Sequence, residues 1–247
     1  MTFTEYGNTN KDTVLLLHGG GLSWWNYREV AEQLESDYRV ILPILDGHGG
    51  SDREFSTIED NVQEIIDFVE KELGGSVLLM GGVSLGAQIL LEILSQRSRI
   101  CRYALVESAL VIPSKLTHAL VRPTLACSCG LICQRWFAKV QAKYLKIPEV
   151  LFEDYFRDTC AISRGSMAAF LEGNAMYSLK DALQSCGAEV RILVGEKEIP
   201  SMKRSADRIR QAVPGSKLQI LSEMHHGEFA LCHPRDYAAM LRKILRK

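Results

Sequence analysis

One segment of the 247-residue chain carries residues whose types and spacing could do covalent chemistry. It is the pentapeptide Gly82-Val83-Ser84-Leu85-Gly86, in which a serine stands two positions from a glycine on either side. A serine hydroxyl exposed at a sharp turn can attack a carbonyl carbon when a nearby base takes its proton. The pattern therefore makes Ser84 the candidate nucleophile.

The residues that flank the pentapeptide predict the turn that such a serine needs. The apolar run Ser76–Met80 predicts a buried strand before it, and Ala87–Leu94 predicts a helix after it. A strand that passes directly into a helix strains the residue at the apex, and small residues on both sides let strand and helix approach. A phosphate-binding loop would need a G-x-G-x-x-G spacing, which is absent here.

Short apolar runs alternate with amphipathic stretches along the rest of the chain, and this pattern is typical of a parallel sheet flanked by helices. The runs are continuously apolar, as expected for strands that are covered on both faces. The predicted strands are Thr13–Leu17, Tyr38–Ile44, Ser76–Gly81, Tyr103–Val106, Val190–Val194 and Lys217–Leu221.

Helices are predicted between these strands. Apolar residues recur at helical spacing over Thr57–Leu73, and Ser56 with Glu59 forms a capping-box pattern at the start of that stretch. A C-terminal helix is expected with Pro234 near its first turn. The fold class expected from the whole pattern is α/β, with a mostly parallel central sheet flanked by helices.

One long region lacks any strand signal. Between residues 113 and 186 only helical pieces are predicted, such as Leu131–Lys146 and Pro148–Ile162. We expect this insertion to form a helical cap over the carboxyl edge of the sheet, where open α/β sheets bind ligands. The remaining segments, 1–112 and 187–247, would form the core domain.

These features together resemble the α/β-hydrolase family over nearly the whole chain. The run Leu15–Gly21 resembles the family's strand followed by a His-Gly oxyanion loop. The resemblance implies that the backbone amides of Leu85 and Gly20 form the oxyanion hole, and Gly21 is an alternative because three consecutive glycines leave the register open. His18 is expected to brace the loop rather than to transfer protons.

The resemblance also implies a histidine base, because the family's triad follows the order serine, acid, histidine. The segment His225–Glu228 comes directly after the last predicted strand. His226 matches the family's His-Gly signature better than His225, which remains the alternative. The turn Asp46–Asp52 resembles a structural G-H-G-x-S loop of the family, so His48 is not a catalytic candidate.

The acid of the triad is expected on the loop after Val190–Val194. That loop reads Gly195-Glu196-Lys197-Glu198 and resembles a Gly-x-x-Asp pattern of the family. Glu198 stands at the Asp position, so the residue departs from the common one while a carboxylate is retained. Glu196 is the alternative.

Composition excludes several other classes of protein. With 29 Lys and Arg against 30 Asp and Glu, the overall balance indicates no nucleic-acid partner and no acidic membrane surface. No apolar run is long enough for a membrane span, and the N-terminus lacks a signal-peptide pattern, so a cytoplasmic location is expected. The cluster Cys127, Cys129 and Cys133 lacks a fourth ligand at metal-site spacing, so no metal is expected there. The serine chemistry requires no cofactor, and none is expected.

The resemblance predicts a serine hydrolase that acts on a carbonyl compound, with a carboxylester of small to medium size as the default substrate. A thioesterase, a lactonase and a carbon–carbon bond hydrolase remain alternatives within the same chemistry. A ligand-binding receptor on the same fold is the alternative from another class, because fold alone does not determine function. The expected partner is a small molecule with an apolar acyl group.

Overall fold

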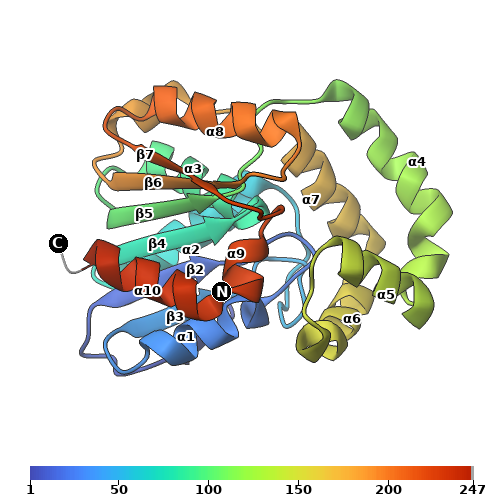
Figure 1. Cartoon of the computed structure of the whole chain (residues 1–247), viewed down its shortest axis with the longest axis horizontal. Coiled ribbons are helices and arrows are strands. Elements are labelled where there is room, and N and C mark those ends of the chain that lie inside the picture. Colours follow the sequence, from blue (N-terminus) through green and yellow to red (C-terminus); the bar gives the residue numbers. More distant parts are fainter. Residues whose placement is uncertain (246–247) are drawn as a thin grey trace.

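A seven-stranded sheet runs through the middle of the computed structural model, which describes residues 1–245 (Figure 1). The strand order is β1-β3-β2-β4-β5-β6-β7; β1 pairs antiparallel with β3, and every other pairing is parallel. The strands are β1 (Phe3–Tyr6), β2 (Thr13–Leu17), β3 (Arg39–Pro43), β4 (Val77–Val83), β5 (Cys101–Glu107), β6 (Glu189–Gly195) and β7 (Lys217–Leu221).

Helices cover both faces of this sheet. One apolar core joins the sheet to α2, α3 and α8, and a second core joins the opposite face to α1, α9 and α10. The α-helices are α1 (Arg28–Leu34), α2 (Ile58–Glu72), α3 (Leu85–Gln96), α4 (Lys115–Ile132), α5 (Arg135–Tyr144), α6 (Phe152–Ala161), α7 (Arg164–Met176), α8 (Pro200–Ala212), α9 (Glu228–Cys232) and α10 (Pro234–Leu245). Short 3-10 helices span Trp24–Tyr27, Glu149–Leu151 and Asp181–Ser185.

The observed sheet confirms the predicted fold class. β2 and β7 have the predicted bounds, and the other four predicted strands differ at their ends by one or two residues. The strand that sequence reasoning missed is β1, whose four residues are exposed or half-buried and therefore lack the apolar run of a central strand. It adds an antiparallel edge to the sheet.

The predicted cap of α2 is wrong by one residue. Thr57, and not Ser56, is the N-cap, and its hydroxyl accepts a hydrogen bond of 3.0 Å from the backbone N–H of Asp60. Ser56 instead donates its hydroxyl to the carboxylate of Asp60. Both positions carry a hydroxyl followed three residues later by a carboxylate, so the pattern alone did not distinguish them.

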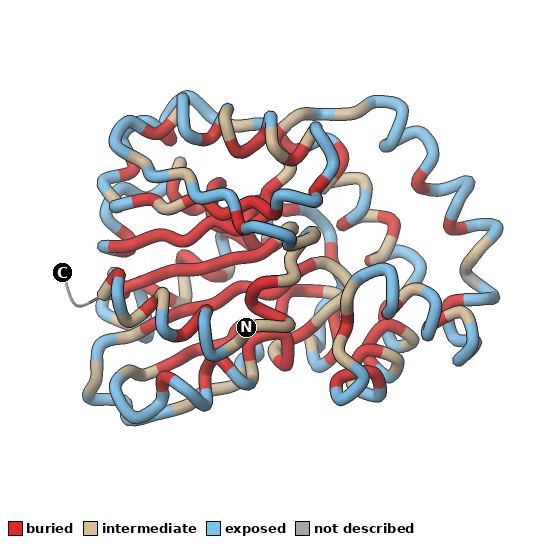
Figure 2. Tube along the Cα trace, viewed as in Figure 1, coloured by how far each residue is buried: buried red, intermediate tan, exposed pale blue. Residues whose placement is uncertain are grey.

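Between β5 and β6 the chain is helical, from α4 to the 3-10 helix at Asp181–Ser185. The single helix expected over Leu131–Lys146 is wrong: α4 ends at Ile132 and α5 begins at Arg135. α4 packs along α7, and Figure 2 shows it as mostly exposed, with few buried positions along its length. The predicted boundaries of a separate cap domain, 113 and 186, stay a prediction.

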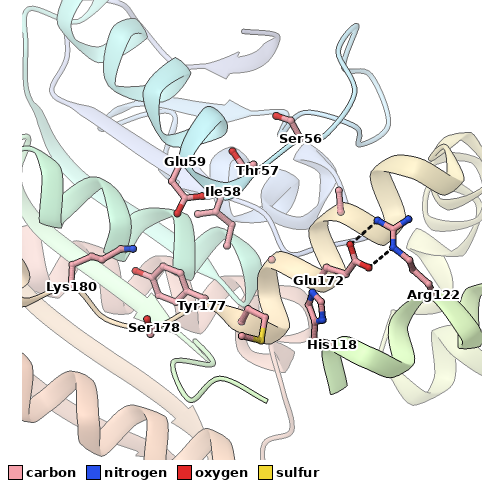
Figure 3. Close-up of a pocket in the computed structure, with 13 residues that line it drawn as sticks. Ser56, Thr57, Ile58, Glu59, His118, Arg122, Glu172, Tyr177, Ser178 and Lys180 are labelled. Carbon is pink, nitrogen blue, oxygen red and sulfur yellow. Dashed lines mark hydrogen bonds and ion pairs between the residues drawn. The ribbon is translucent and has the colours of Figure 1, made fainter. Parts of the chain in front are cut away.

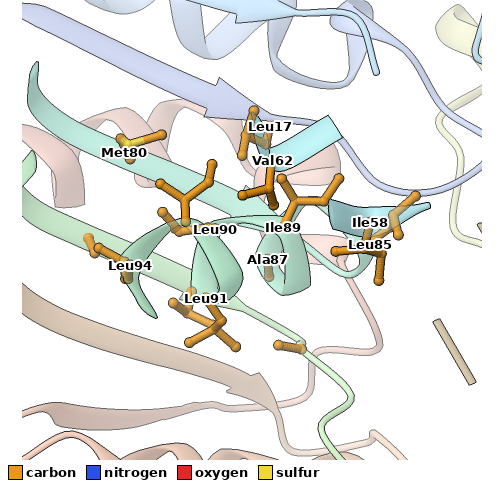
Figure 4. Close-up of a cluster of buried hydrophobic side chains, with 14 of the residues drawn as sticks. Leu17, Ile58, Val62, Met80, Leu85, Ala87, Ile89, Leu90, Leu91 and Leu94 are labelled. Carbon is orange, nitrogen blue, oxygen red and sulfur yellow. The ribbon is translucent and has the colours of Figure 1, made fainter. Parts of the chain in front are cut away.

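The helix that follows the candidate nucleophile is the most deeply buried helix-length segment of the fold. Ten consecutive residues of α3, from Leu85 to Leu94, are buried. Figure 4 shows its side chains packed against Leu17 of β2 and Val62 of α2. This packing fixes the N-terminus of α3, and with it Ser84, relative to the sheet.

Candidate active site

Ser84 stands at the apex of the turn between β4 and α3. Its backbone has φ 54° and ψ −115°, a conformation that side-chain-bearing residues adopt only under strain. A Cβ at Gly82 would lie 2.4 Å from the carbonyl oxygen of Gly86, and a Cβ at Gly86 would lie 2.3 Å from that of Leu17. Both glycines are therefore required for strand and helix to cross at this distance.

A chain of hydrogen bonds joins Ser84, His226 and Glu198. The Ser84 Oγ lies 3.0 Å from Nε2 of His226, and Nδ1 of the same ring lies 2.8 Å from Oε2 of Glu198. Because an ionised carboxylate only accepts hydrogen bonds, Nδ1 carries the proton and Nε2 is free to accept from the serine hydroxyl. The imidazole edge faces solvent on the serine side, whereas the Glu198 side chain is fully buried.

The second carboxylate oxygen of Glu198 is also held on two sides. Oε1 accepts the backbone N–H of Gly195 at 2.7 Å and the hydroxyl of Ser108 at 2.8 Å. Burial alone would raise the pKa of Glu198, but the hydrogen bond and charge of His226, with these two donors, outweigh it and lower the pKa. The carboxyl group is therefore ionised at neutral pH, as the orienting acid of a histidine must be.

Ser108 is a site residue that sequence reasoning missed. It directly follows β5, is buried, and has φ 53°. Its hydroxyl donates to Glu198 and accepts the backbone N–H of Gly227 at 3.3 Å, so it bridges the acid loop and the histidine loop. No spacing rule identifies such a residue, because its role depends on β5 lying next to β6 in the sheet.

The alternatives considered for the base and the acid have other partners. His225 Nδ1 lies 2.9 Å from the carboxylate of Glu228, within the same loop. The Glu196 carboxylate accepts hydrogen bonds from the hydroxyl of Ser222 and the backbone N–H of Glu223. The structure thus brings His226 and Glu198 to Ser84, and it does not bring His225 and Glu196 there.

The glycine loop after β2 lies beside the N-terminus of α3. A turn closed by the N–H of Leu22 and the carbonyl of Gly19, 3.2 Å apart, places Gly21 at φ 77°. A Cβ at Gly20 would lie 3.5 Å from the Leu85 side chain, whereas a Cβ at Gly21 would have no neighbour within 4 Å. These distances place Gly20 nearer than Gly21 to the start of α3, and the assignment of the Gly20 amide to the oxyanion hole stays a prediction.

Two buried histidines, His18 and His48, form hydrogen bonds with the backbone of the loops after β2 and β3. The His18 Nδ1–H donates to the carbonyl of Gly19 at 2.9 Å, and Nε2 accepts the backbone N–H of Leu45 at 3.1 Å. Burial, helped by the adjacent His48, lowers the pKa of His18 to about 3, and burial lowers that of His48 to about 4. Both rings are neutral at neutral pH, and both ring nitrogens of His18 are engaged in hydrogen bonds with the backbone, which fits a bracing role.

A second buried carboxyl group, Glu107, lies at the end of β5. Burial, and then the charge of Glu198, raise the pKa of Glu107 to about 8, although hydrogen bonds from the backbone of Phe229 and Ala230 act in the opposite direction. Glu107 is therefore protonated at neutral pH. Its backbone carbonyl accepts the N–H of Ser84 at 2.9 Å. Its carboxyl group contacts the backbone of α9 behind the histidine loop and forms no hydrogen bond with Ser84 among those described for residues 1–245.

A pocket of about 300 Å³ opens beside the imidazole of His226. The residues that line it are Tyr144, Leu145, Lys197, Glu198, Ile199, Met202, His225 and His226. Its walls therefore come from the end of α5, the acid loop, the start of α8 and the histidine loop, and most of the side chains apart from the charged groups are apolar.

A larger hollow lies away from these residues. It measures about 460 Å³ and lies between the start of α2, α4 and α7, where Arg122 forms a two-point ion pair with Glu172 (Figure 3). His118 and Lys180 also line it, so its wall is more polar. Its volume alone would make this hollow the candidate active site. The hydrogen-bonded Ser84 and His226 do not line it, however, and the candidate active site is where those reactive groups are.

The cysteine cluster of the sequence lies at the end of α4. Cys127 and Cys133 are exposed free thiols, and the side chain of Cys129 lies outside the described part of the structure. Over the described residues, no group of three or more His, Cys, Asp or Glu side chains could hold a metal ion. Over the same residues, no helix is both long and apolar enough to cross a membrane.

The sequence matches a known protein family over most of its length. Residues 14–240 match the model of the alpha/beta hydrolase family, and the chain belongs to that family. A search of curated proteins found no match.

Solved structures share the fold at low sequence identity. A thermophilic esterase from Thermogutta terrifontis superposes with a TM-score of 0.81 at 17% identity, covering 99% of this chain and 92% of the other. The enol-lactonase from Burkholderia xenovorans superposes with a TM-score of 0.83 at 14% identity, and the match covers 100% of this chain and 96% of the lactonase. MenH from S. aureus superposes with a TM-score of 0.78 at 19% identity, and the match covers 99% of this chain and 97% of MenH. At such identities the likeness concerns the fold.

Proposed function

We propose that this hydrolase cleaves a carboxylester of small to medium size through a Ser84–His226–Glu198 triad and an acyl-enzyme. The observation that carries the proposal is the continuous hydrogen-bond chain from the strained serine through the imidazole to a buried, ionised carboxylate. A serine hydrogen-bonded to a histidine that is hydrogen-bonded to a carboxylate supports nucleophilic catalysis on several unrelated folds.

In the proposed mechanism, His226 Nε2 takes the proton of the Ser84 hydroxyl as Oγ attacks the substrate carbonyl. The negative charge that develops on the carbonyl oxygen is met by the backbone N–H groups of Leu85 and Gly20. The imidazolium then protonates the leaving alcohol, and Glu198 stabilises the positive ring throughout. Water attacks the acyl-enzyme with His226 again as base, and the acid product leaves Ser84 as a free hydroxyl.

The substrate class follows from the wall of the pocket beside His226. Tyr144, Leu145, Ile199 and Met202 offer an apolar surface next to His226, the proposed base, although Ser84 itself does not line this pocket. An apolar surface there favours an apolar acyl or alkyl group. A lactone is the runner-up substrate, because the structural neighbours include an enol-lactonase. The finer substrate class and a cytoplasmic location both stay predictions.

Labelling with a fluorophosphonate, followed by a substrate panel, tests the proposal. The probe should label the wild type at Ser84 and leave Ser84→Ala unlabelled, whereas a non-catalytic ligand-binding receptor would react at neither. A panel of p-nitrophenyl esters, thioesters and lactones of graded chain length should then give the highest kcat/KM with an ester. Labelling without turnover of any ester would contradict the substrate class but retain the triad.

A further inference from the structure

The charge of this chain is distributed unevenly, although its total is nearly balanced. The 41 residues from Ser108 to Pro148 contain no Asp or Glu and six Lys or Arg, which leaves 23 basic and 30 acidic residues for the rest. The segment includes α4 and α5. The overall balance of 29 against 30 therefore conceals one segment that is rich in basic residues, of which Arg122 and Arg135 form ion pairs with Glu172 and Glu153 of the neighbouring helices.

Helix α5 presents an exposed apolar stripe within this basic segment. Trp136, Val140 and Tyr144 recur every four residues and are 61%, 62% and 84% exposed. The residues that α5 buries are Ala138 and Ala142, each two positions from Val140. Since residues two positions apart on a helix point in nearly opposite directions, the apolar stripe points away from the side on which α5 packs.

A basic stripe runs beside the apolar one. Arg135, Lys139 and Lys143 also recur every four residues, each one position before a residue of the apolar stripe. Arg135 pairs with Glu153, whereas Lys139 and Lys143 form no ion pair within residues 1–245. Lysine side chains in such positions can lay their methylene groups along apolar surface and keep the ammonium group in water.

Helix α4, which precedes α5 in the chain, also carries exposed apolar residues. Leu116, Leu120 and Leu131 are exposed and lie on the side of α4 away from Val121 and Leu125, the residues that it buries against α7. Of the thirteen large apolar residues that are exposed in the described structure, seven fall between Leu116 and Leu145. Exposed apolar groups that concentrate in one segment favour a binding surface over scattered surface residues.

We propose that this surface docks on an anionic lipid bilayer, lying in its headgroup region. We call it the α4–α5 face; its residues are Leu116, Leu120, Leu131, Trp136, Lys139, Val140, Lys143 and Tyr144. An amphipathic basic helix with an exposed Trp and Tyr beside its lysines has the composition of helices that bind membrane interfaces without crossing them.

The charges on the face favour lipid over a protein partner. Two copies meeting through it would bring Lys139 and Lys143 of both copies together, four lysines without an ion pair among residues 1–245, while the neighbouring carboxylate of Glu153 already pairs with Arg135. Cores of protein–protein interfaces are depleted in lysine, whereas here lysines alternate with aliphatic and aromatic groups. An anionic headgroup layer over an apolar interior matches both stripes at once.

The face is continuous with the candidate active site. Tyr144, the last residue of the apolar stripe, and its neighbour Leu145 line the pocket beside His226. Docking would therefore bring the opening of that pocket to the lipid surface, where an amphiphilic ester could enter from the bilayer. The docking itself does not depend on the proposed esterase activity, because none of the residues of the face is in the triad.

Sedimentation with vesicles tests the docking directly. The full chain is mixed with phosphatidylcholine vesicles with and without phosphatidylglycerol, the anionic lipid, and the bound fraction is measured as NaCl is raised. We expect binding that needs the anionic lipid and weakens with salt. Equal binding to both vesicles, or binding to neither, would overturn the proposal, whatever the activity on a soluble ester.

Matched pairs of variants locate the contact. Lys139→Gln with Lys143→Gln should weaken binding roughly 10- to 30-fold, since each basic residue near an anionic surface contributes several-fold in affinity. Arg204→Gln with Arg208→Gln is the control, because these residues are also exposed, four positions apart on α8, and form no ion pair among the described residues. Equal losses in the two pairs would show that only net charge matters and would overturn the assignment to this face.

The apolar stripe has its own readout. Trp136 is the most exposed of the three tryptophans, whereas Trp25 is buried and Trp24 is partly buried, so insertion of Trp136 among headgroups should shift tryptophan emission to shorter wavelength. Trp136→Phe should abolish the shift while binding persists, and Val140→Ser should weaken binding where Ile220→Ser, on the far strand β7, does not. A concentration-dependent dimer that Val140→Ser dissociates, without any vesicle binding, would assign the face to self-association and contradict the proposal.

Discussion

Ser108 and Glu198 lie 90 positions apart in the chain and are joined by a buried hydrogen bond of 2.8 Å. The same Ser108 hydroxyl accepts the N–H of Gly227, the residue after the histidine that contacts Ser84. One side chain at the end of β5 thus links the loop that carries the acid to the loop that carries the base. The alignment of His226 depends on this link as well as on Glu198.

Removing the Ser108 hydroxyl should reduce turnover without abolishing it. Ser108→Ala leaves a buried oxygen of Glu198 and the N–H of Gly227 with fewer partners, a cost of about 1–3 kcal/mol. We expect kcat on p-nitrophenyl acetate to fall on the order of tenfold or more, with KM little changed. Ser108→Gly relieves the positive φ as well, so an equal fall in both variants would assign the effect to the hydroxyl; unchanged kcat in both would refute the link.

Replacing the candidate nucleophile should abolish turnover and preserve the fold. Ser84→Ala removes the only atom that attacks the carbonyl in the proposed mechanism, so we expect kcat on p-nitrophenyl acetate to fall on the order of a thousandfold or more. The circular dichroism spectrum and melting temperature should stay close to those of the wild type. Retention of wild-type turnover would remove Ser84 from the mechanism.

The two adjacent histidines should behave very differently. His226→Ala should cost nearly as much activity as Ser84→Ala, because nucleophile and base act as a unit. His225→Ala removes a contact with Glu228 and should cost less than about tenfold in kcat/KM, since surface contacts of this kind contribute little. Steady-state kinetics of both variants on one ester decide the point. A larger loss of kcat/KM in His225→Ala than in His226→Ala would identify His225 as the base.

The two glutamates of the acid loop form a second matched pair. Glu198→Gln removes the charge that supports the imidazolium and should lower kcat on the order of a thousandfold or more. Glu198→Asp keeps the charge but moves it one methylene away from His226, so it should cost less than the Gln variant. Glu196→Gln is the control on the same loop and should stay near wild type. Should Glu196→Gln be the inactive one, the acid would have to be reassigned.

The buried Glu107 should make stability depend on pH. Its pKa is about 8 in the folded chain against an ordinary value of 4.5, so the folded state holds the proton more tightly than the unfolded state does. The stability that this proton confers is complete below pH 4.5 and is lost as the pH rises toward 8. Glu107→Gln resembles the protonated form and should lack this loss. Urea unfolding of both proteins across that range measures the difference, and parallel curves would contradict the buried, protonated state.

The sheet and the three aligned side chains could be predicted because local patterns determine them. Ser84 follows β4 directly, and Glu198 and His226 lie on the loops after β6 and β7, so the strand predictions place all three at one edge of the sheet. Ser108 also follows a strand, but a serine after a strand has no distinguishing pattern. Only the sheet order, with β5 between β4 and β6, reveals that it reaches the acid.

The helical segment was harder to predict for two physical reasons. α4 contains Pro123 in its interior, a residue that disfavours helix continuation, so its helix was not expected in full. The apolar residues of α4 and α5 occupy exposed as well as buried sides, so their spacing did not indicate which side packs. Sequence reasoning therefore found helices here but not their breaks.

The close approach of Gly86 to β2 has a consequence for how this enzyme could diverge. A Cβ at Gly86 would meet the carbonyl oxygens of Leu17 and His18 at 2.3 and 2.6 Å, and Gly20 follows two residues later. Contact between main-chain atoms therefore sets the offset between the start of α3, which follows Ser84, and the end of β2. Rotamer changes in the pocket walls leave that offset intact, so substrate preference can vary through Tyr144, Ile199 and their neighbours while the reacting centre stays constant.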